Sequence, residues 1–312
     1  MKRTVVMFLL GMIISETIAQ QDPKFSQSMF LAPMYNAGSV GISDKICLGA
    51  DFRNQWMGVP KAPVSTTFSV DAPLNFLGRA HGVGITLRND NLGFNNDFFF
   101  SLAYSYQIDL GKGKLGLGLN AGLVNQSADP TWEGADVITP EGDPSIPQAG
   151  YSAFGFDMGL GAFYQSDKLY AGLSVTHLNQ TSFNIPEDNA ETRLVRHYYA
   201  TAGYNIQLPN PMIELMPSFL VQTDGKSNHI YLNTNVRYNK KFWGGVSYTI
   251  GGAITALVGV DLMNGAKIGY SYDFDLTKIV GYNTGSHEIT VRYCFDMSFG
   301  KTPQKYKSIR IM

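Results

Sequence analysis

Charged residues are scarce in this chain of 312 residues, because Asp, Glu, Lys and Arg make up only 16% of it. Soluble domains carry roughly 25%. The formal net charge is −1, so the chain lacks the basic excess with which proteins bind nucleic acid. Beyond residue 20 no run of about 18 apolar residues occurs, which excludes a membrane protein built from helices. A hydrophobic fraction of 44% also excludes a disordered chain.

Cysteines and catalytic motifs are equally sparse. Only Cys47 and Cys294 occur, which excludes a disulfide-dense secreted scaffold. No histidine has a second ligand at metal-site spacing, and no G-x-S-x-G, H-E-x-x-H, P-loop or C-x-x-C motif is present. Residues 111–116 match G-x-G-x-x-G, but a strand pattern follows where a nucleotide site needs a helix. We interpret this stretch as a hairpin turn and a glycine-lined strand, and we expect no enzyme, no cofactor and no metal.

Glycine and aromatic residues are abundant instead, with 33 glycines and 12% aromatics. This profile fits an all-β protein, and a membrane β-barrel above all. At the N-terminus a basic pair precedes an apolar stretch at residues 5–14, and small residues follow at Thr17 and Ala19. The stretch is too short to span a bilayer as a helix. We therefore expect residues 1–19 to be a signal peptide cleaved between Ala19 and Gln20, with an uncleaved anchor as the alternative.

From residue 45 onward the chain alternates in steps of two. In residues 115–123 leucine and alanine alternate with glycine and asparagine, and residues 288–299 alternate polar with apolar side chains. This is the period of a β-strand, since a helix would show spacings of three and four. Fourteen segments carry the pattern, near residues 45–54, 64–72, 80–89, 97–108, 114–124, 151–165, 168–177, 196–207, 211–222, 229–239, 241–250, 254–262, 266–274 and 287–299.

The pattern predicts a single-chain antiparallel transmembrane β-barrel of about 14 strands over residues 45–299. An even strand count places both termini in the periplasm, with short periplasmic turns and longer extracellular loops. The long connections 125–150, 178–195 and 275–286 all follow odd-numbered strands, as this topology requires. The connection 251–253 is short for the outside, and 73–79 is long for the inside. A soluble β-sandwich is the alternative, but its fourteen strands would leave edges that need protection.

Two flanking segments complete the organisation. Residues 20–44 form a periplasmic N-terminal segment by parity, and Phe25, Met29, Phe30 and Tyr35 within it need burial. They pack either into the periplasmic mouth as a plug, which we favour, or against a periplasmic partner. Residues 300–312 are a basic periplasmic tail, either unstructured or a contact for such a partner.

Two further features leave alternatives open. Loop 125–150 carries five acidic residues and no basic one, so it is either a solvated external loop or a calcium-bridged or partner-binding loop.

Barrel closure pairs the first strand with the last. Alternation turns Cys47 and Cys294 into the lumen in the periplasmic half, an oxidising compartment. They form either a disulfide across the seam, which needs Cα atoms within about 7 Å, or free thiols.

Charged residues on the strands should also face the lumen. Alternation turns inward three acidic and four basic residues: Asp71, Asp273, Glu288, Arg53, Arg88, Arg237 and Arg292. Charges inside a barrel are usually paired or wet. A specific role in conduction is the alternative that the sequence leaves open.

Short motifs recur in a fixed order along residues 20–299. Residues 21–30 read Q-D-P-K-F-S-Q-S-M-F, residues 53–58 R-N-Q-W-M-G, residues 269–273 G-Y-S-Y-D and residues 285–289 G-S-H-E-I. The motif residues are Asp22, Pro23, Phe25, Ser26, Gln27, Met29, Phe30, Arg53, Gln55, Trp56, Gly58, Pro63, Asp90, Gly93, Pro217, Ser218, Gly244, Tyr248, Gly269, Tyr270, Tyr272, Asp273, Gly285, Ser286, His287 and Glu288.

In these motifs the chain resembles the PorP/SprF family of type IX secretion system outer-membrane proteins. One segment departs from the family, because the proline that follows the asparagine of its N-P-A-x-A-G stretch is missing after Asn36. The resemblance implies a non-enzymatic barrel in the cell outer membrane that serves type IX secretion and gliding. Its implied partners are outer-membrane lipid, type IX components, a secreted adhesin-like surface protein and, as one option, a peptidoglycan-associated periplasmic protein.

Two other functions stand beside this one. The first is an outer-membrane channel for a small, hydrophobic substrate, which a robust open pore would favour. The second is a barrel enzyme acting on lipid, which would need a Ser–His pair near the outer leaflet. The sequence offers no Ser–His pair at positions i and i+2 of one strand.

Overall fold

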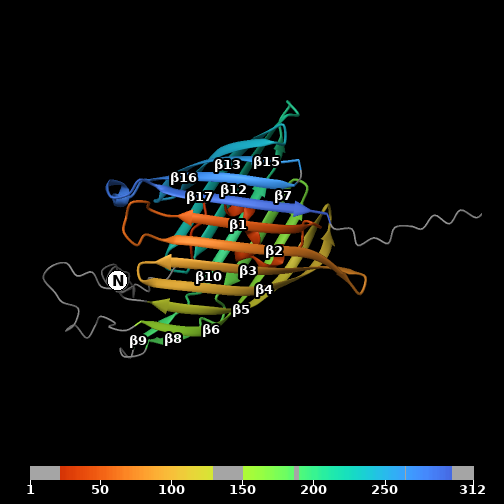
Figure 1. Cartoon of the computed structure of the whole chain (residues 1–312). Coiled ribbons are helices and arrows are strands. Elements are labelled where there is room, and N and C mark those ends of the chain that lie inside the picture. The colour runs from red at the N-terminus through yellow and green to blue at the C-terminus, as the bar shows by residue number, and fades with distance from the viewer. Residues whose placement is uncertain (1–21, 129–149, 186–189, 264, 297–312) are drawn as a thin grey trace, which may run out of the picture.

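The computed structural model describes residues 22–128, 150–185, 190–263 and 265–296. The expected signal peptide, most of loop 125–150 and the basic tail lie outside this range and stay predictions. Strands fill most of it, and the helical elements are short (Figure 1). No helix among the described residues is long and apolar enough to cross a membrane.

The strands follow one another along the chain and are numbered in that order. They are β1 Ile46–Asn54, β2 Val64–Phe76, β3 Arg79–Leu92, β4 Asn95–Leu110, β5 Gly113–Ala128, β6 Tyr151–Ser166, β7 Leu169–Thr176, β8 Ser182–Ile185, β9 Ala190–Arg193, β10 His197–Tyr204, β11 Ile206–Gln207, β12 Ile213–Thr223, β13 Asn228–Tyr238, β14 Phe242–Thr249, β15 Ala253–Asp261, β16 Ala266–Asp275 and β17 Ser286–Phe295. The helical elements are η1 Ser28–Phe30, α2 Ala32–Tyr35, η2 Ala37–Ser39 and η4 Lys278–Gly281.

The sheet closes on itself. Each wall strand pairs antiparallel with the next, β1 pairs with β17, and β10 pairs with both β7 and β12. β11 continues β10 along β12, so the two form one wall strand. Counted in this way the wall has fourteen strands, and the predicted antiparallel barrel is confirmed. β8 and β9 form a separate hairpin inside the predicted loop 178–195.

The two ends of the barrel differ in their connections. We call the end with turns such as 111–112 and 167–168 the periplasmic end, and the other the extracellular end. One predicted connection is wrong. β2 continues to Phe76 and β3 begins at Arg79, so the turn consists of Leu77 and Gly78 and does not span residues 73–79. The alternation fades at Pro73, which lacks an N–H for a ladder, yet Pro73 pairs with Gly82 inside the hairpin.

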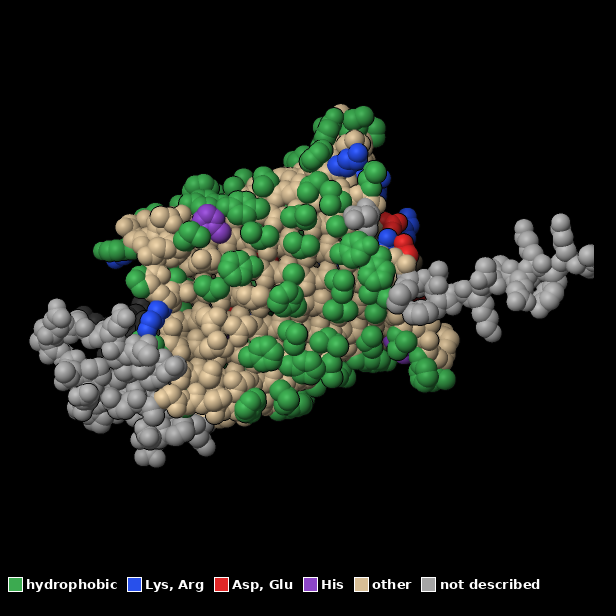
Figure 2. All heavy atoms as spheres, viewed as in Figure 1, with side chains coloured by type: hydrophobic (Ala, Val, Ile, Leu, Met, Phe, Trp, Pro, Cys, Tyr) green, Lys and Arg blue, Asp and Glu red, His purple; other side chains and the backbone are tan. Residues whose placement is uncertain are grey.

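The outer surface of the wall is apolar (Figure 2). Alternate side chains such as Phe68, Leu119, Leu173 and Val246 point outward and are at least half exposed. Their neighbours along each strand point into the lumen, as the burial alternation of β13 shows. Most of these inward residues are small or polar, and a few are large aromatic or aliphatic residues. This arrangement is that of an outer-membrane barrel, whose strands alternate between lipid and lumen.

Candidate functional site: the occupied lumen

The segment that precedes β1 lies inside the barrel, and we call residues 22–45 the plug segment. At its start Asp22 contacts Arg88 near the end of β3 and His177 just beyond β7, both at the extracellular end. Further along, the Gly41 N–H donates to Asp71 at 3.0 Å in the periplasmic half of β2. The segment thus extends much deeper than the periplasmic mouth where the sequence placed it, because its polar groups find buried partners along the whole lumen.

Apolar residues of the plug segment form the core of the molecule. Ala32, Tyr35 and Ile42 pack with inward-facing aromatic and aliphatic residues of the wall, among them Phe163 and Tyr199. The rings of Tyr35 and Tyr199 stack at 5.4 Å between centroids. The predicted burial of the large apolar residues is therefore met at Tyr35 by packing inside the lumen.

A buried ion-pair network holds the first half of the plug segment. We call Arg53, Asp273, Glu288, Ser26 and Gln27 the Arg53 cluster. The Arg53 guanidinium lies 2.6 Å from an Asp273 oxygen and 2.9 Å from a Glu288 oxygen. The backbone N–H groups of Ser26 and Gln27 donate to the two Glu288 oxygens at 2.7 and 2.8 Å. The Ser26 hydroxyl accepts from Arg53 at 2.9 Å and donates to Asp273 at 2.8 Å.

The Arg53 cluster brings together four motifs that are far apart in the sequence. Arg53 of β1 lies directly opposite Glu288 of β17, and Asp273 belongs to the next strand, β16. Ser26 and Gln27 come from the Q-D-P-K-F-S-Q-S-M-F opening. Alternation predicted that the three charged side chains face the lumen, but no sequence pattern indicated that they hold the plug segment.

A second buried network holds the start of the plug segment at the extracellular end. We call Asp22, Arg88, His177, Tyr199 and Asp157 the Asp22 cluster. One Asp22 oxygen lies 3.0 Å from the Arg88 guanidinium and 2.9 Å from His177 Nε2. The other Asp22 oxygen accepts the Tyr199 hydroxyl at 2.6 Å. His177 Nδ1 contacts Asp157 at 3.0 Å, so the imidazole bridges two carboxylates.

These contacts favour the charged forms of both Asp22 and His177. Burial alone would raise the pKa of the Asp22 carboxyl, but His177 and Arg88 outweigh it and hold that pKa well below its ordinary value. Burial alone would lower the pKa of His177, but the Asp22 and Asp157 carboxylates raise it to about 10. The cluster is therefore an ion-pair network with a protonated imidazole at neutral pH.

Two histidines and one carboxylate come close enough here to suggest a metal. The ligand atoms of Asp22, His177 and His197 lie within 4.8 Å of one another. However, both Asp22 oxygens are already hydrogen-bonded, and the Arg88 guanidinium lies 3.0 Å away. A cation would have to displace a guanidinium and deprotonate His177, so the donor set fits an ion pair better than a metal. The histidines are far apart in the sequence, which gave no signal that they meet.

Glycines of the wall make room for the backbone of the plug segment. A Cβ built on Gly82, Gly116 or Gly118 would collide with plug backbone atoms at Val40, Gly38 or Ala37 respectively. The Ser105 hydroxyl donates to the Gly38 carbonyl at 3.1 Å in the same region. The glycine-lined strand that follows the G-x-G-x-x-G stretch thus leaves the space that the backbone of the plug segment occupies.

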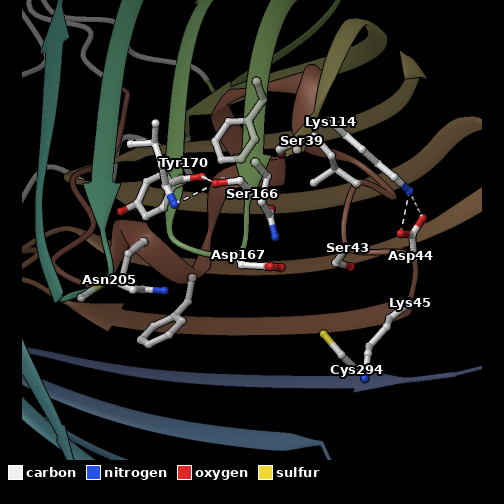
Figure 3. A pocket seen from close by; sticks show the side chains of 18 of the residues that line it. Ser39, Ser43, Asp44, Lys45, Lys114, Ser166, Asp167, Tyr170, Asn205 and Cys294 are labelled. Atoms are coloured by element: carbon white, nitrogen blue, oxygen red, sulfur yellow. Dashed lines mark hydrogen bonds and ion pairs between the residues drawn. The ribbon is translucent and has the colours of Figure 1, made fainter. Parts of the chain in front are cut away.

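A cavity opens at the periplasmic end, between the plug segment and the turns (Figure 3). Its volume is about 680 Å³, and Ser39, Ser43, Ser166 and Asn205 supply polar groups to its lining. Lys114 reaches the Asp44 carboxylate across the cavity edge at 2.5 Å. We call this space the mouth cavity.

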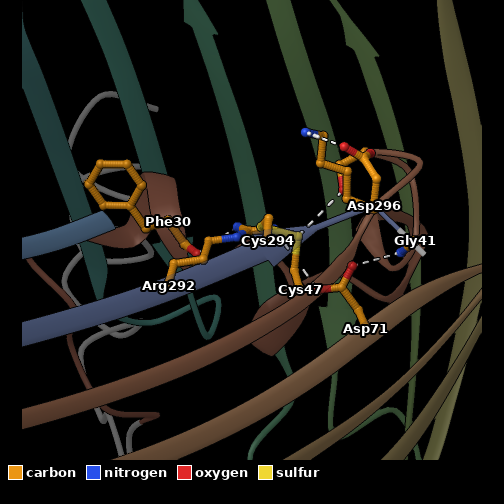
Figure 4. The surroundings of a disulfide bond; sticks show 9 residues. Phe30, Gly41, Cys47, Asp71, Arg292, Cys294 and Asp296 are labelled. Carbon is orange, nitrogen blue, oxygen red and sulfur yellow. Dashed lines mark hydrogen bonds and ion pairs between the residues drawn. A yellow bond between two sulfur atoms is a disulfide. The ribbon is translucent and has the colours of Figure 1, made fainter. Parts of the chain in front are cut away.

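A disulfide closes the wall beside the mouth cavity (Figure 4). Cys47 of β1 and Cys294 of β17 lie opposite each other in register, with Cα atoms 4.1 Å apart, and their sulfur atoms are bonded. Arg292, next to it in β17, donates to the Phe30 carbonyl at 2.9 Å. The disulfide joins residues 247 positions apart at the seam where the barrel closes.

The other motif residues do not gather in one place. Gly58, Gly93 and Gly285 lie in extracellular connections at φ values of 99°, 66° and 97°, a region that favours glycine. Tyr248 and Tyr270 face outward and are 43% and 38% exposed. The structure thus separates motif residues that hold the plug segment from residues that shape loops or face lipid.

The comparison with protein families decides the identity. The family described as type IX secretion system membrane protein PorP/SprF matches residues 17–293. The chain belongs to the PorP/SprF family. As a PorP/SprF protein it is an outer-membrane protein of the type IX secretion system, and the family expected from the sequence motifs is confirmed. A search of curated proteins gives no match.

Solved structures similar to this PorP/SprF chain are also barrels. Omp33 of Acinetobacter baumannii is 8% identical, with 81% of this chain and 99% of that chain covered and a TM-score of 0.46. The toluene transporter TbuX of Ralstonia pickettii is 14% identical, with 84% and 92% covered and a TM-score of 0.48. A mutant porin of Rh. blastica is 11% identical, with 80% and 99% covered and a TM-score of 0.33. Likenesses this distant carry no argument about function.

Proposed function

We propose that this PorP/SprF protein is a non-enzymatic outer-membrane barrel that helps export or anchor a secreted surface protein. It does so in contact with periplasmic components of the type IX system, a peptidoglycan-associated protein among the candidates. The observation that carries the proposal is the occupied lumen. The plug segment runs through the barrel and is fixed by the Asp22 cluster at one end and the Arg53 cluster further along. A rigid, filled barrel suits an anchor.

The same clusters disfavour a channel for a small hydrophobic substrate. Opening the lumen would require the plug segment to leave, and Arg53, Asp273 and Glu288 would lose the Ser26 and Gln27 donors. Uncompensated buried charge costs several kcal/mol. We also assign no catalytic role to these buried groups, since each already bonds another protein group in the same network.

A gene deletion tests the proposal. We expect the deletion strain to lose one surface protein, or to retain it inside the cell, while the uptake of small hydrophobic compounds stays unchanged. Surface proteomics and uptake assays measure the two effects, and a plasmid copy of the intact gene must restore the surface protein. Loss of uptake with an unchanged surface proteome would establish the channel in place of the proposed role.

Conductance of the purified full chain adds an independent measurement. We expect no steady current in planar bilayers, whereas a variant that lacks residues 22–43 should conduct because the lumen is then unfilled. A large steady current from the intact chain would contradict the filled-lumen argument.

A further inference from the structure

The charged residues that line the mouth cavity are mostly basic. Six lysine or arginine side chains and two aspartates lie around it: Lys45, Lys112, Lys114, Lys168, Lys267, Arg292, Asp44 and Asp167. They come from the end of the plug segment, three periplasmic turns or strand ends, and β17. Alternation had predicted that Arg292 faces the lumen, but the other seven were not predicted as site residues, because strand ends and turns carry solvated charges in most proteins.

Part of this positive charge is left without a neutralising partner. Four of the six basic groups have an ion-pair partner: Lys114 pairs with Asp44 at 2.5 Å, Lys267 with Asp261 at 2.9 Å, Lys45 with Asp296 at 3.4 Å and Arg292 with Asp71 at 3.9 Å. Lys112 and Lys168 have no ion-pair partner among the residues that the structure describes. They lie in two neighbouring turns, β4–β5 and β6–β7. The cavity therefore presents an excess of positive charge to the periplasm.

The cavity also has an apolar part. Met29, Phe30 and Ile42 of the plug segment and Phe163 and Tyr170 of the wall contribute to its lining. A volume of about 680 Å³ lies within the range of roughly 300–1,000 Å³ that is typical of ligand pockets. A pocket with apolar walls and an excess of positive charge favours a ligand that carries negative charges and a nonpolar group.

We propose that the mouth cavity binds an acidic peptide segment of a periplasmic protein, with an apolar side chain of that segment resting on the plug. The inference rests on the proposed contact with periplasmic machinery and names the chemistry of that contact. The cavity lies between the plug segment and the wall, inside the barrel, so it faces the aqueous periplasm and not the lipid. The chain's own tail cannot be the occupant, because residues 301–312 carry four basic residues and no acidic one.

The mouth cavity can be tested on the purified full chain in detergent. The probe is a fluorescein-labelled glutamate-rich peptide with one central phenylalanine, and fluorescence anisotropy measures its binding. We expect the double variant Lys112→Gln, Lys168→Gln to bind roughly fivefold more weakly, because partly exposed charge pairs each contribute about 0.5 kcal/mol. Binding should also weaken as salt is raised, since screening acts on solvent-accessible charges.

A matched control lies at the same end of the barrel. Lys240 and Lys241 sit in the β13–β14 turn and do not line the mouth cavity, so Lys240→Gln, Lys241→Gln should leave binding within about twofold. A peptide with glutamine in place of glutamate should bind weakly to every variant.

Three results would overturn the inference. They are equal binding of the probe to both double variants, equal binding of the neutral peptide, and displacement of the probe by an anionic muropeptide but not by unlabelled acidic peptide. None of them bears on the gene-deletion test, so failure of the cavity assignment and failure of the proposed function stay distinguishable.

Discussion

At the residue scale, the Arg53 cluster depends on the charge of Arg53 itself. It bonds the Asp273 and Glu288 carboxylates and the Ser26 hydroxyl, and its side chain is 6% exposed. One guanidinium cannot neutralise two carboxylates, and the backbone N–H groups of the plug segment supply the remaining donors. Wall and plug segment therefore complete each other's hydrogen bonding.

Replacing Arg53 by methionine should destabilise the folded barrel strongly. Two buried carboxylates would lose their counter-charge, and breaking a buried pair in this way costs about 3–5 kcal/mol. Urea unfolding in lipid vesicles measures the free energy of unfolding. The control is Arg79→Met at the exposed start of β3, where we expect a change within about 0.5 kcal/mol. Equal effects of the two substitutions would show that the Arg53 cluster does not stabilise the fold.

The Asp22 cluster predicts a dependence of stability on pH. The pKa of His177 is raised to about 10 from 6.5, so its contribution is complete below pH 6.5 and is lost as the pH rises towards 10. The pKa of Asp22 is lowered from 3.8, so its contribution is present above pH 3.8 and is lost at lower pH. We expect the urea midpoint to fall between pH 7 and pH 10.

His177→Gln should remove most of this fall in the midpoint. The matched control is His287→Gln, because His287 Nδ1 contacts the Tyr270 hydroxyl at 2.7 Å and not a carboxylate. A pH profile that is the same for His177→Gln and for the unmodified protein would contradict the ion-pair assignment.

At the scale of elements, the plug segment and the glycines of β3 and β5 form one packing unit. The backbone of the segment lies against these strands, because a Cβ on Gly82, Gly116 or Gly118 would meet its backbone atoms. The Asn36 side chain adds hydrogen bonds to β6 and β7, where its Nδ2 donates to the carbonyls of Ala162 and Leu173 at 3.1 and 3.2 Å. Glycine weakens a strand, so β3 and β5 give up some of their own stability to make room for the plug segment.

Gly118→Ala should displace the plug segment. Its Cβ would overlap the Ala37 backbone, which cannot move aside as a flexible side chain can. Without this contact alanine would stabilise the strand by roughly 0.5–1 kcal/mol, so the sign of the stability change decides the matter. We expect a loss of stability and new conductance in planar bilayers. Gly281→Ala, where a Cβ would meet open space, should change neither, and a stabilised Gly118→Ala barrel would contradict the packing.

At the scale of the whole molecule, the seam between β1 and β17 is where the first and last strands meet. The disulfide links the two strands at the periplasmic end of the seam, and the Arg53–Glu288 ion pair links them six residues further along β1. Both pairs lie in register across the seam. Closure of the barrel thus depends on contacts between residues that are more than two hundred positions apart.

The double variant Cys47→Ser, Cys294→Ser should therefore fold but unfold more easily. Loss of a cross-link over a long loop costs about 2–4 kcal/mol, which urea unfolding measures under oxidising conditions. Reductant should lower the midpoint of the unmodified protein to a similar extent and leave the variant unchanged. If reductant leaves the urea midpoint of the unmodified protein unchanged, the disulfide does not form in the isolated barrel.

The sequence by itself determined the wall of this protein. A period of two in side-chain polarity is set locally, by the strand geometry and by the lipid outside, and so it yielded the fourteen strands and the inward direction of Arg53, Asp273 and Glu288. The family motifs were equally visible along the chain. The length of the β2–β3 turn was predicted wrongly, because Pro73 interrupts the strand pattern in the sequence. In the structure β2 continues past it, and Pro73 pairs with Gly82 of β3.

Only the tertiary structure decided what fills the lumen. Asp22 meets His177 and Arg88, and Ser26 meets Glu288, because closure of the sheet brings distant strands around a common space. A local sequence pattern cannot predict such contacts, because the alternation along a strand fixes only whether a side chain faces the lumen or the lipid. The course of the plug segment through the lumen and the basic mouth cavity follow from that closure, and both are properties of the assembled barrel.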